Sequence, residues 1–190
     1  MRTLKYHLKW RRRYVRTIGK VRDREVYHEE ILPYLSTLPQ IKRVLDIGCE
    51  WYNLHHRRLF RQHEYWTIDL DAEKAGFGSR NHIVGSALEL DKHFEADSFD
   101  LVLCNGVFGW GVNESSEVAS LAEQVASMLV VGGKVVVGWN PGTTNVPELS
   151  PSVAMSLQFD PWKFPPQKAS SFIANRENGH TFEFFAKKLP

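Results

Sequence analysis

The apolar positions of the chain gather in short runs that are separated by longer stretches of mixed polarity. Five runs are rich in Val, Ile, Leu and aromatic residues and end at glycine or a polar residue, which is typical of buried strands. They span residues 44–48, 65–69, 81–86, 99–105 and 134–139. Because stretches of helical character separate most of these runs, the pattern predicts an α/β fold with a parallel, doubly wound sheet.

The stretches between these strands predict helices of different quality. The clearest helix begins near Asn113, which we expect to be its cap. Its apolar stripe recurs every three or four residues, at Val118, Leu121, Val125 and Met128. Residues 54–62 predict the crossover helix after the first strand, and residues 72–76 predict a short helix after the second. Residues 25–38 predict a further helix that is broken or kinked at Pro33.

The pattern changes after Trp139. Six of the nine prolines lie between Pro141 and Pro166, which predicts an irregular segment with one short helix near residues 150–157. We expect residues 141–168 to form a lid over the acceptor. In the tail, apolar runs flank Asn178-Gly179, and an Asn-Gly pair in this context is a strong signal for a two-residue hairpin turn. Residues 170–188 therefore predict an antiparallel hairpin.

Length and composition are those of a folded protein with one domain and an appendage. The chain has 190 residues and is 43% hydrophobic, which is sufficient for a buried core. No stretch has the roughly 20 consecutive apolar residues of a membrane span, and the N-terminus has no apolar signal region. Two cysteines, Cys49 and Cys104, do not make a disulfide framework and are expected to be small core residues. We therefore expect a cytoplasmic protein.

Charge is distributed unevenly along the chain. Residues 1–24 contain ten Lys or Arg residues and one acid, whereas the remainder has 14 basic and 21 acidic residues. Residues 1–40 are predicted to form a basic helical arm, and residues 41–190 the main domain. Apolar residues recur at helical spacing in the arm, so it is expected either to pack on the acidic body or on a second subunit of a homodimer, or to hold an anionic partner such as RNA or phospholipid.

Three motifs lie around the predicted strands. They are RVLDIGCEWYN at residues 43–53 with YWTIDLD at 65–71, SFDLVLCNGVFGW at 98–110, and LVVGGK at 129–134. Their order and spacing resemble the class I S-adenosylmethionine-dependent methyltransferases, especially the branch that acts on small molecules. The resemblance covers residues 43–188. It implies a Rossmann-like sheet of five parallel strands plus a C-terminal antiparallel hairpin.

The first motif departs from the family pattern, in which this turn reads D-x-G-x-G-x-G. Asp46 and Gly48 match, but Glu50 and Tyr52 stand at the two later glycine positions. Two interpretations stay open: Glu50 accepts hydrogen bonds from the ammonium group of the cofactor's methionine end, or Trp51 and Tyr52 fill the cavity. Non-glycine residues also tolerate positive φ poorly, so the turn itself is expected to be reshaped.

The resemblance implies S-adenosyl-L-methionine as cofactor, bound outside the carboxyl ends of the strands. Asp69 is implied to accept hydrogen bonds from the ribose hydroxyls, with Asp71 as a nearby substitute. Ser86 is implied to contact the adenine amino group. The full set of implied cofactor contacts is Asp46, Gly48, Cys49, Glu50, Asp69, Leu70, Ser86, Ala87 and Asn105.

Chemistry beyond the cofactor is less well defined. Methyl transfer from a sulfonium needs little acid–base chemistry, because proximity and alignment supply most of the acceleration. Catalytic residues are therefore left unassigned, and the candidates for a base are His28, His180 and Glu50. The cluster of His55, His56 and His63 does not predict a metal site, since adjacent residues project about 100° apart on a helix.

Aromatic residues follow three of the predicted strands. Trp51, Trp110 and Trp139 each come after the carboxyl end of a strand, so they are expected to converge on one face. The residues expected to cap that face are Phe159, Trp162 and Phe164. This arrangement indicates either an aromatic cavity for a flat or cationic acceptor or a hydrophobic plug in an unused cofactor site.

The first functional hypothesis is methyl transfer from S-adenosylmethionine to a small-molecule acceptor. Two alternatives stay open. One is a non-catalytic binding protein with the same fold, which would bind no cofactor. The other is an RNA methyltransferase that uses the basic arm as a clamp, for which nucleic-acid binding would depend steeply on salt and on residues 1–24.

Overall fold

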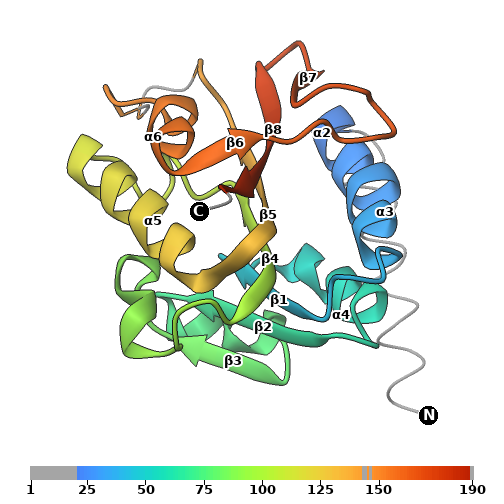
Figure 1. Cartoon of the computed structure of the whole chain (residues 1–190), viewed down its shortest axis with the longest axis vertical. Helices are drawn as coiled ribbons and strands as arrows, with labels where there is room; N and C mark the ends of the chain where they lie inside the picture. The colour runs from blue at the N-terminus through green and yellow to red at the C-terminus, as the bar shows by residue number, and fades with distance from the viewer. Residues whose placement is uncertain (1–20, 143–144, 146, 189–190) are drawn as a thin grey trace.

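The computed structural model describes residues 21–142, 145 and 147–188. Residues 1–20 of the predicted basic arm lie outside the described residues, so the partners of the arm stay a prediction. The described part forms one sheet with helices against both of its faces (Figure 1). Figure 1 shows α2 and α3 on one side of the sheet and α5 and α6 on the other.

The elements have the following bounds in chain order. The helices are α2 (Arg22–Glu25), the π-helix η1 (Val26–Ile31), α3 (Leu32–Ser36), η2 (Trp51–His55), α4 (His56–Leu59), η3 (Ala72–Phe77), η4 (Ala87–Lys92), α5 (Ser115–Met128) and α6 (Pro151–Gln158), of which η2, η3 and η4 are 3₁₀ helices. The strands are β1 (Arg43–Ile47), β2 (Glu64–Asp69), β3 (Asn81–Val84), β4 (Phe99–Asn105), β5 (Leu129–Trp139), β6 (Phe159–Pro161), β7 (Ser171–Asn175) and β8 (His180–Lys187).

The sheet has the strand order β3-β2-β1-β4-β5-β8-β6, and β7 also pairs with β8. The first five strands of this order are parallel to their neighbours. β8 is antiparallel to β5, and it pairs along its other edge with β6 and β7. The predicted Rossmann-like sheet of five parallel strands plus a C-terminal antiparallel hairpin is confirmed. β6 is an additional strand, which three residues ending in proline did not reveal in the sequence.

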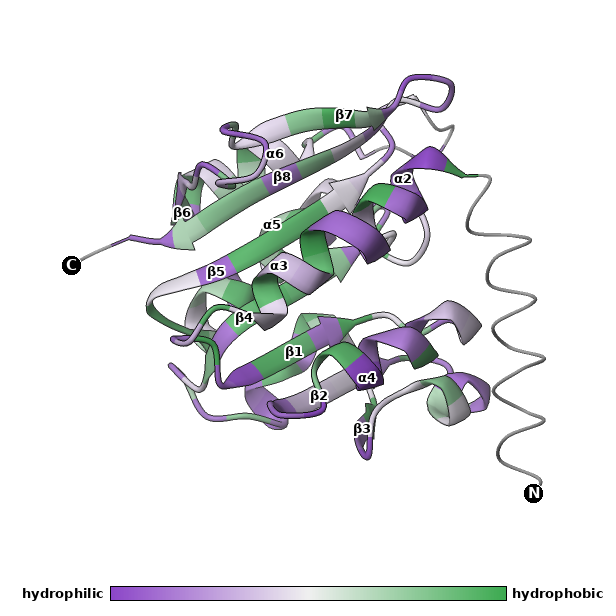
Figure 2. Ribbon diagram, turned by 90° about the vertical axis from the view of Figure 1, so that its right-hand side faces the viewer, coloured by the Kyte–Doolittle hydropathy of each residue, from purple (hydrophilic) through white to green (hydrophobic). Residues whose placement is uncertain are grey.

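The central strands are hydrophobic along their length because both of their faces are covered (Figure 2). In β4, Leu101 and Leu103 pack into the cluster beneath α3 and α4, whereas Val102 and Cys104 pack into the cluster beneath α5 and α6. The alternation follows from the two-residue period of a strand. The continuous apolar runs in the sequence therefore predicted the buried strands correctly.

The helices differ more from the predictions. The crossover expected at residues 54–62 is a 3₁₀ turn, η2, followed by the single turn of α4, so it begins and ends three residues earlier. α5 is capped by Glu114 rather than Asn113: the Glu114 carboxylate accepts from the Glu117 backbone, and Glu117 accepts from the Glu114 N–H at 3.0 Å. This reciprocal capping box satisfies two free N–H groups, which a single Asn cap does not.

The kink predicted at Pro33 takes the form of a widened helical turn. α2, η1 and α3 follow one another without a break, and the π-helix η1 ends just before the proline. Proline has no N–H to donate to the preceding turn, and its ring crowds that turn, which favours a local departure from α geometry. This continuous segment matters for the site because its first turn reaches the functional pocket.

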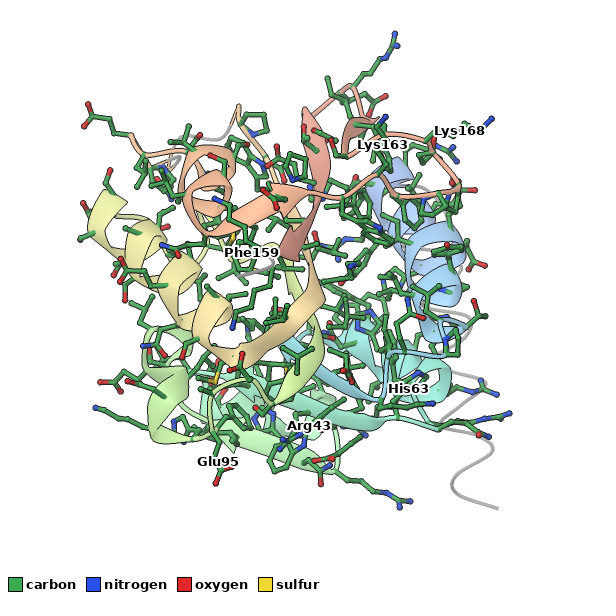
Figure 3. All side chains as sticks on the ribbon, in the orientation of Figure 1. Arg43, His63, Glu95, Phe159, Lys163 and Lys168 are labelled. Carbon is green, nitrogen blue, oxygen red and sulfur yellow. The ribbon has the colours of Figure 1, made fainter. Side chains whose placement is uncertain are left out.

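The proline-rich segment is built into the core rather than placed over a site. Phe164 stacks on Phe184 with ring centroids 4.6 Å apart, and Phe159 packs with Phe185. Trp162 contacts the same cluster. Figure 3 shows Phe159 inside the molecule and Lys163 and Lys168 on its outside. The expectation that Phe159, Trp162 and Phe164 cap the ligand face is therefore wrong: large apolar side chains at the sheet edge are buried against β8 instead.

The C-terminal hairpin forms where predicted but with a longer turn. Asn175 pairs with His180, which leaves four residues in the loop rather than two. Gly179 adopts a left-handed φ of 71°, and Asn178 Oδ1 accepts from the His180 N–H at 3.0 Å. The Asn-Gly signal thus identified the turn, while its exact length depends on how β7 pairs with β8.

Candidate functional site

A pocket of about 1080 Å³ opens at the carboxyl ends of the parallel strands. All nine sequence-predicted cofactor contacts line it. We call this group the strand-end wall; it consists of Asp46, Gly48, Cys49, Glu50, Asp69, Leu70, Ser86, Ala87 and Asn105. A second group lines the same pocket from α2 and η1, from the residue after β5 and from the C-terminal hairpin. We call it the helix-and-hairpin wall; it consists of Asp23, Arg24, Tyr27, Asn140, Asn178 and His180.

The turn after β1 needs one glycine, and that glycine is present. Gly48 has φ +85°, a conformation that side chains disfavour, and its N–H donates to the Ile68 carbonyl at 2.9 Å. Glu50 is extended, with φ −136°, and begins η2 as its N-cap. Its side chain accepts from the Asn53 backbone, while Asn53 Oδ1 accepts from the Glu50 N–H. A capping box therefore replaces the later glycines of the family pattern.

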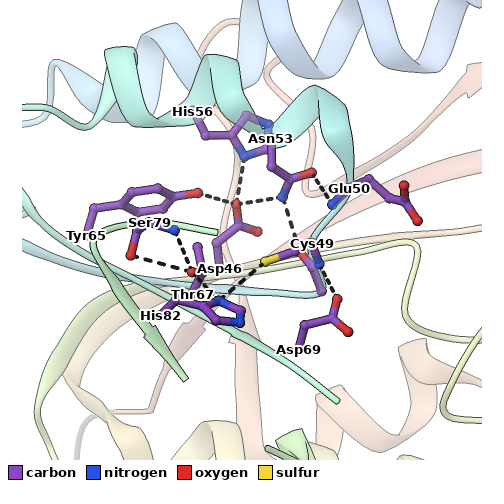
Figure 4. A network of polar contacts seen from close by, with 11 residues as sticks. Asp46, Cys49, Glu50, Asn53, His56, Tyr65, Thr67, Asp69, Ser79 and His82 are labelled. Atoms are coloured by element: carbon purple, nitrogen blue, oxygen red, sulfur yellow. Dashed lines mark hydrogen bonds and ion pairs between the residues drawn. The ribbon is translucent and has the colours of Figure 1, made fainter. Parts of the chain in front are cut away.

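Beneath this turn, Asp46 is the centre of a buried polar network (Figure 4). The side chain is 2% exposed, and its Oδ2 accepts from Asn53 Nδ2 at 3.2 Å, His56 Nδ1 at 2.7 Å and Tyr65 Oη at 2.7 Å. The same Asn53 amide donates to the Gly48 carbonyl. Asp46 thus ties β1, β2 and η2 together and shapes the floor of the pocket.

The Asp69 carboxylate, at the end of β2, is fixed in place by two backbone N–H groups. Its Oδ2 accepts from the Cys49 N–H at 2.6 Å (Figure 4). Its Oδ1 accepts from the Asp71 N–H at 2.9 Å. Each carboxylate oxygen retains a further lone pair, and the side chain is half-buried in the pocket wall. The adjacent Leu70 is 76% exposed, which is unusual for a large apolar side chain. A fixed carboxylate beside an exposed apolar surface suits a ligand that carries both hydroxyls and a flat ring.

Glu50 is paired with a residue that the sequence reading missed. Lys74 Nζ in η3 lies 2.8 Å from Glu50 Oε1, and the Lys74 pKa is raised, first by this hydrogen bond. Both side chains line the pocket at its solvent side, with about a third of each exposed. Lys74 carries no local motif in the sequence; it is brought to Glu50 by the short 3₁₀ turn after β2. The pair offers both signs of charge at one place.

Tyr52 does not fill the pocket. Its ring lies under the Arg24 guanidinium, whose central carbon is 3.9 Å from the ring centroid. The neighbouring Trp51 packs edge-on against Tyr52 and is absent from the pocket lining in the described part of the chain. Tyr52 is therefore part of the pocket lining, and the cavity stays open beside it.

The remaining predicted contacts have structural partners of their own. Ser86 Oγ accepts from the Leu88 N–H at 3.2 Å and caps η4, which leaves its O–H free to donate toward the pocket. Asn105 lies against Gly138, and its buried Oδ1 has no hydrogen-bond partner among the described residues. A buried unpaired amide oxygen indicates a missing donor.

The cysteines behave as core residues, as predicted. Both are buried and free. Burial, with the nearby Asp46 and Asp69 carboxylates, raises the pKa of the Cys49 thiol to about 12. Burial and Asp46 also raise the pKa of Cys104. Because the thiolate is the reactive form, neither residue is suited to nucleophilic or redox chemistry.

The histidines separate into two environments. His28 packs against His55 and His56, with ring centroids 5.9 and 5.0 Å away, and burial lowers the His28 pKa to about 2. His28 is not among the described residues that line the pocket, so it is misplaced as a candidate base. His63 packs on Phe60 instead. Among the described residues, no group of three or more His, Cys, Asp or Glu side chains is arranged to hold a metal ion.

His180 is the candidate base that does reach the pocket. It is 5% exposed, and its Nδ1 lies 2.6 Å from Asn140 Oδ1. Burial lowers its pKa to about 4, against an opposing effect of the Asp23 carboxylate. Asp23 is itself 7% exposed and accepts from Asn175 Nδ2 at 3.0 Å. No local sequence pattern marks Asp23, because its hydrogen bond joins chain positions that lie far apart.

The three tryptophans do not converge. Trp110 lines the pocket and is 76% exposed at its rim. Trp139 is buried and donates from Nε1 to Glu183 at 2.9 Å, away from the pocket lining of the described residues. Because Trp51 and Trp139 are absent from the pocket lining of the described residues, the expected aromatic face is reduced to Trp110 alone among these three. None of the described residues of the segment 141–168 lines the pocket either.

The fold is similar to solved structures over most of its length. The N-methyltransferase NodS from Bradyrhizobium japonicum, in complex with S-adenosyl-l-homocysteine, matches with a TM-score of 0.68 at 14% identity, over 86% of this chain and 87% of that chain. A TehB-like SAM-dependent methyltransferase from Corynebacterium glutamicum matches with a TM-score of 0.63 at 18% identity, over 98% of each chain. The chain has the fold of the class I S-adenosylmethionine-dependent methyltransferases.

Another structure of similar fold contains two bound small molecules. The 1,6-didemethyltoxoflavin-N1-methyltransferase from Burkholderia thailandensis, with bound 1,6-didemethyltoxoflavin and S-adenosylhomocysteine, matches with a TM-score of 0.56 at 14% identity, over 97% of this chain and 90% of that chain. No protein-family profile matches the chain, and no curated protein sequence matches it. The structural similarity therefore shows the methyltransferase fold. The activity has to be inferred from the residues that line the pocket. None of the described helices combines the length and apolar content that a membrane crossing needs.

Proposed function

We propose that the protein binds S-adenosyl-L-methionine and transfers its methyl group to a small-molecule acceptor. The observation that carries this proposal is the strand-end wall: nine residues from four separate strand ends line one open pocket. Two structural neighbours hold S-adenosylhomocysteine in the same fold. The pocket, at about 1080 Å³, has room for a cofactor and a small acceptor together.

The residues of the strand-end wall fit this cofactor. Asp69, fixed by two backbone N–H groups, would accept hydrogen bonds from the ribose hydroxyls, and exposed Leu70 would cover one face of the adenine. Gly48 leaves its backbone accessible at the turn. Asn105 lines the pocket at the end of β4. When bound, the cofactor supplies an electrophilic methyl group on a sulfonium, and the protein contributes binding and alignment.

The charge of the pocket also supports a cationic ligand. Six acidic and two basic side chains line it among the described residues. The acids are Asp23, Asp46, Glu50, Asp69, Asp71 and Glu117, and the bases are Arg24 and Lys74. A sulfonium cofactor gains from this surplus of negative charge, whereas an RNA phosphate in the same place is repelled. We therefore favour a small-molecule acceptor over RNA.

The proposal is tested by calorimetric titration of S-adenosylhomocysteine into the protein and its Asp69→Asn variant. The amide keeps an oxygen for the Cys49 N–H but loses the charge and an acceptor site. We expect micromolar binding by the native protein and at least about tenfold weaker binding by the variant. Asp91→Asn, an exposed acid outside the pocket lining, is the matched control and should bind like the native protein.

A Glu50→Gln variant separates the two interpretations of the eroded turn. If Glu50 holds the ammonium group of the methionine end, the variant binds S-adenosylhomocysteine more weakly while 5′-methylthioadenosine, which lacks that group, binds unchanged. If both ligands bind the variant as they bind the native protein, Glu50 serves only as the cap of η2. Absence of binding by the native protein at millimolar ligand would instead support a binding protein that has lost the cofactor.

A further inference from the structure

The helix-and-hairpin wall carries two buried hydrogen-bond acceptors that the strand-end wall does not use. Asp23 comes from the first turn of the helical segment α2–η1–α3, and His180 comes from the start of β8. They are 7% and 5% exposed, and both line the pocket. α2 lies beside the hairpin of β7 and β8 (Figure 1). Asp23 Oδ1 already accepts from Asn175 Nδ2 at 3.0 Å, so its second oxygen, Oδ2, and His180 are the acceptors left for a ligand in the pocket.

The hydrogen bonds around His180 define which of its ring nitrogens is the acceptor. Asn140 Nδ2 donates to the Asn178 carbonyl at 3.4 Å, so the other end of this amide, Oδ1, faces His180 Nδ1. Nδ1 therefore carries the proton, and Nε2 carries a lone pair. Nε2 is buried and has no hydrogen-bond partner among the described residues.

Burial keeps the His180 ring neutral, against the opposing effect of the Asp23 carboxylate. Burial lowers its pKa most strongly, the Arg24 guanidinium lowers it further, and the Asp23 carboxylate raises it, with a result of about 4. At neutral pH His180 is thus a hydrogen-bond acceptor and a poor store for a proton. Asp23 supplies negative charge close enough to act on the same ring, and Arg24 is engaged with the Tyr52 ring.

We propose that Asp23 and His180 form the acceptor subsite and that the methyl acceptor is an amine. A primary amine has two N–H donors and one lone pair once it is neutral. The Asp23 carboxylate and His180 Nε2 can each accept one N–H, which leaves the lone pair for the methyl group. An alcohol has one hydrogen to donate and satisfies one of the two acceptors, and a carboxylate has none and is repelled by Asp23.

The reaction at this subsite balances without a further reagent. The ammonium form of the acceptor first gives one proton to water. The nitrogen lone pair then forms the N–C bond as the C–S bond breaks, and the electron pair of that bond stays on the sulfur. The nitrogen gains positive charge as it is methylated, and the buried Asp23 carboxylate stabilises that charge. This inference rests on the proposed function for the methyl donor, but amine binding does not depend on it.

The subsite is tested by the binding of three probes of similar shape: benzylamine, benzyl alcohol and benzoate. The aromatic ring is chosen because exposed Trp110 lines the same pocket. Affinities are measured by calorimetry or by NMR titration, with and without S-adenosylhomocysteine. We expect benzylamine to bind at least about tenfold more tightly than benzyl alcohol, and benzoate not to bind. Equal affinities for the amine and the alcohol in the native protein would overturn the proposal.

A variant of Asp23 and a matched control test whether this carboxylate causes the preference for the amine. Asp23→Asn should lower benzylamine affinity about tenfold and leave benzyl alcohol unchanged, because it removes charge but keeps the shape. Glu177→Gln, an exposed acid in the hairpin loop outside this pocket, is the matched control. An Asp23→Asn protein that is folded by circular dichroism and still prefers the amine would contradict the assignment.

A spectroscopic measurement on the native protein does not depend on any variant being folded. The ¹⁵N resonance of His180 Nε2 should shift when benzylamine binds, because a free lone pair becomes a hydrogen-bond acceptor, and it should stay unchanged with toluene. An unchanged Nε2 resonance in the presence of bound benzylamine would exclude His180 from the subsite. Amine binding without S-adenosylhomocysteine binding would overturn the proposed function alone, whereas the reverse result would overturn the subsite alone.

Discussion

The strand-end wall and the helix-and-hairpin wall line the same pocket but are built in different ways. The strand-end wall joins positions that lie close in the sequence, as in the Glu50–Asn53 capping box and the Asp69–Asp71 hydrogen bond, and its Cys49–Asp69 hydrogen bond spans only 20 positions. The helix-and-hairpin wall joins Asp23 to Asn175, 152 positions apart. We propose that the first wall binds the cofactor and that the second, which depends on how this chain packs its two ends together, selects the acceptor.

The largest effect is expected from breaking the floor of the strand-end wall. Asp46→Ala leaves three buried donors, on Asn53, His56 and Tyr65, without their acceptor. We expect the free energy of unfolding to fall by about 3 kcal/mol, measured by urea denaturation. Asp91→Ala should stay within about 0.5 kcal/mol of the native protein. A loss below about 1 kcal/mol in Asp46→Ala would show that the network is not needed for the turn.

Acid should affect the side of the pocket that contains His180 and the nearby helix that contains His28. Their pKa values of about 4 and about 2 lie below the ordinary 6.5, since both rings are buried. Above pH 6.5 both are neutral in the folded and unfolded states. Below it the unfolded state binds protons that the folded state does not, so stability falls by up to about 1.4 kcal/mol per pH unit for each histidine.

This pH dependence is checked by urea denaturation at pH 7, 6 and 5. The loss of unfolding free energy caused by His180 should continue down to about pH 4. The loss caused by His28 should continue to still lower pH. His180→Phe keeps a ring in place and should reduce the slope, whereas Trp66→Phe, remote from both histidines, should not. A native protein whose stability is constant from pH 7 to pH 5 would contradict the buried, neutral state of both rings.

A smaller loss of stability is expected from substituting Gly48, the glycine that the turn after β1 requires. Gly48→Ala places a side chain at φ +85°, which should cost about 1 kcal/mol even though the added carbon meets Val107 only at a normal 3.6 Å. Gly76→Ala is the control, because no atom lies within 4 Å of the added carbon and φ is not positive there. Equal melting temperatures of the two variants would show that the turn after β1 tolerates a side chain.

The smallest change in stability, with a clear change in binding, is expected at Leu70. Its side chain is 76% exposed, so Leu70→Ala should alter the free energy of unfolding by less than about 0.5 kcal/mol. If it covers the adenine, S-adenosylhomocysteine should bind several-fold more weakly, because an apolar contact is lost. Val131→Ala, also exposed but remote from the pocket, should bind like the native protein. Unchanged binding by Leu70→Ala would remove this residue from the cofactor site.

The sequence predicted the strand-end wall well because its signals are local. β4 was predicted with its observed bounds, since an apolar strand buried on both faces leaves a continuous run of hydrophobic letters. Gly48 and Asp69 were recognisable because a glycine and a carboxylate follow apolar runs. The capping box of η2 was missed, since Glu50 was compared with a glycine pattern rather than tested as a helix start.

The helix-and-hairpin wall was not predictable in the same way. Asp23 lies within the most basic stretch of the chain, where a single acid has the pattern of a compensating charge. Its burial depends on the packing of α2 against β7, which no local pattern encodes. The aromatic residues of the proline-rich segment were misplaced for the same reason: Phe159 and Phe164 are large enough to cap a site, but the edge of β8 buries more of their surface.

The most direct test of the division between the walls is a calorimetric titration of S-adenosylhomocysteine into three proteins: native, Asp69→Asn and Asp23→Asn. Both variants remove one negative charge from the same pocket, so a general electrostatic effect would weaken them equally. We predict micromolar binding by the native protein, binding within about twofold of it by Asp23→Asn, and at least about tenfold weaker binding by Asp69→Asn. Equal losses in the two variants, or no binding by the native protein, would contradict the assignment of the strand-end wall to the cofactor.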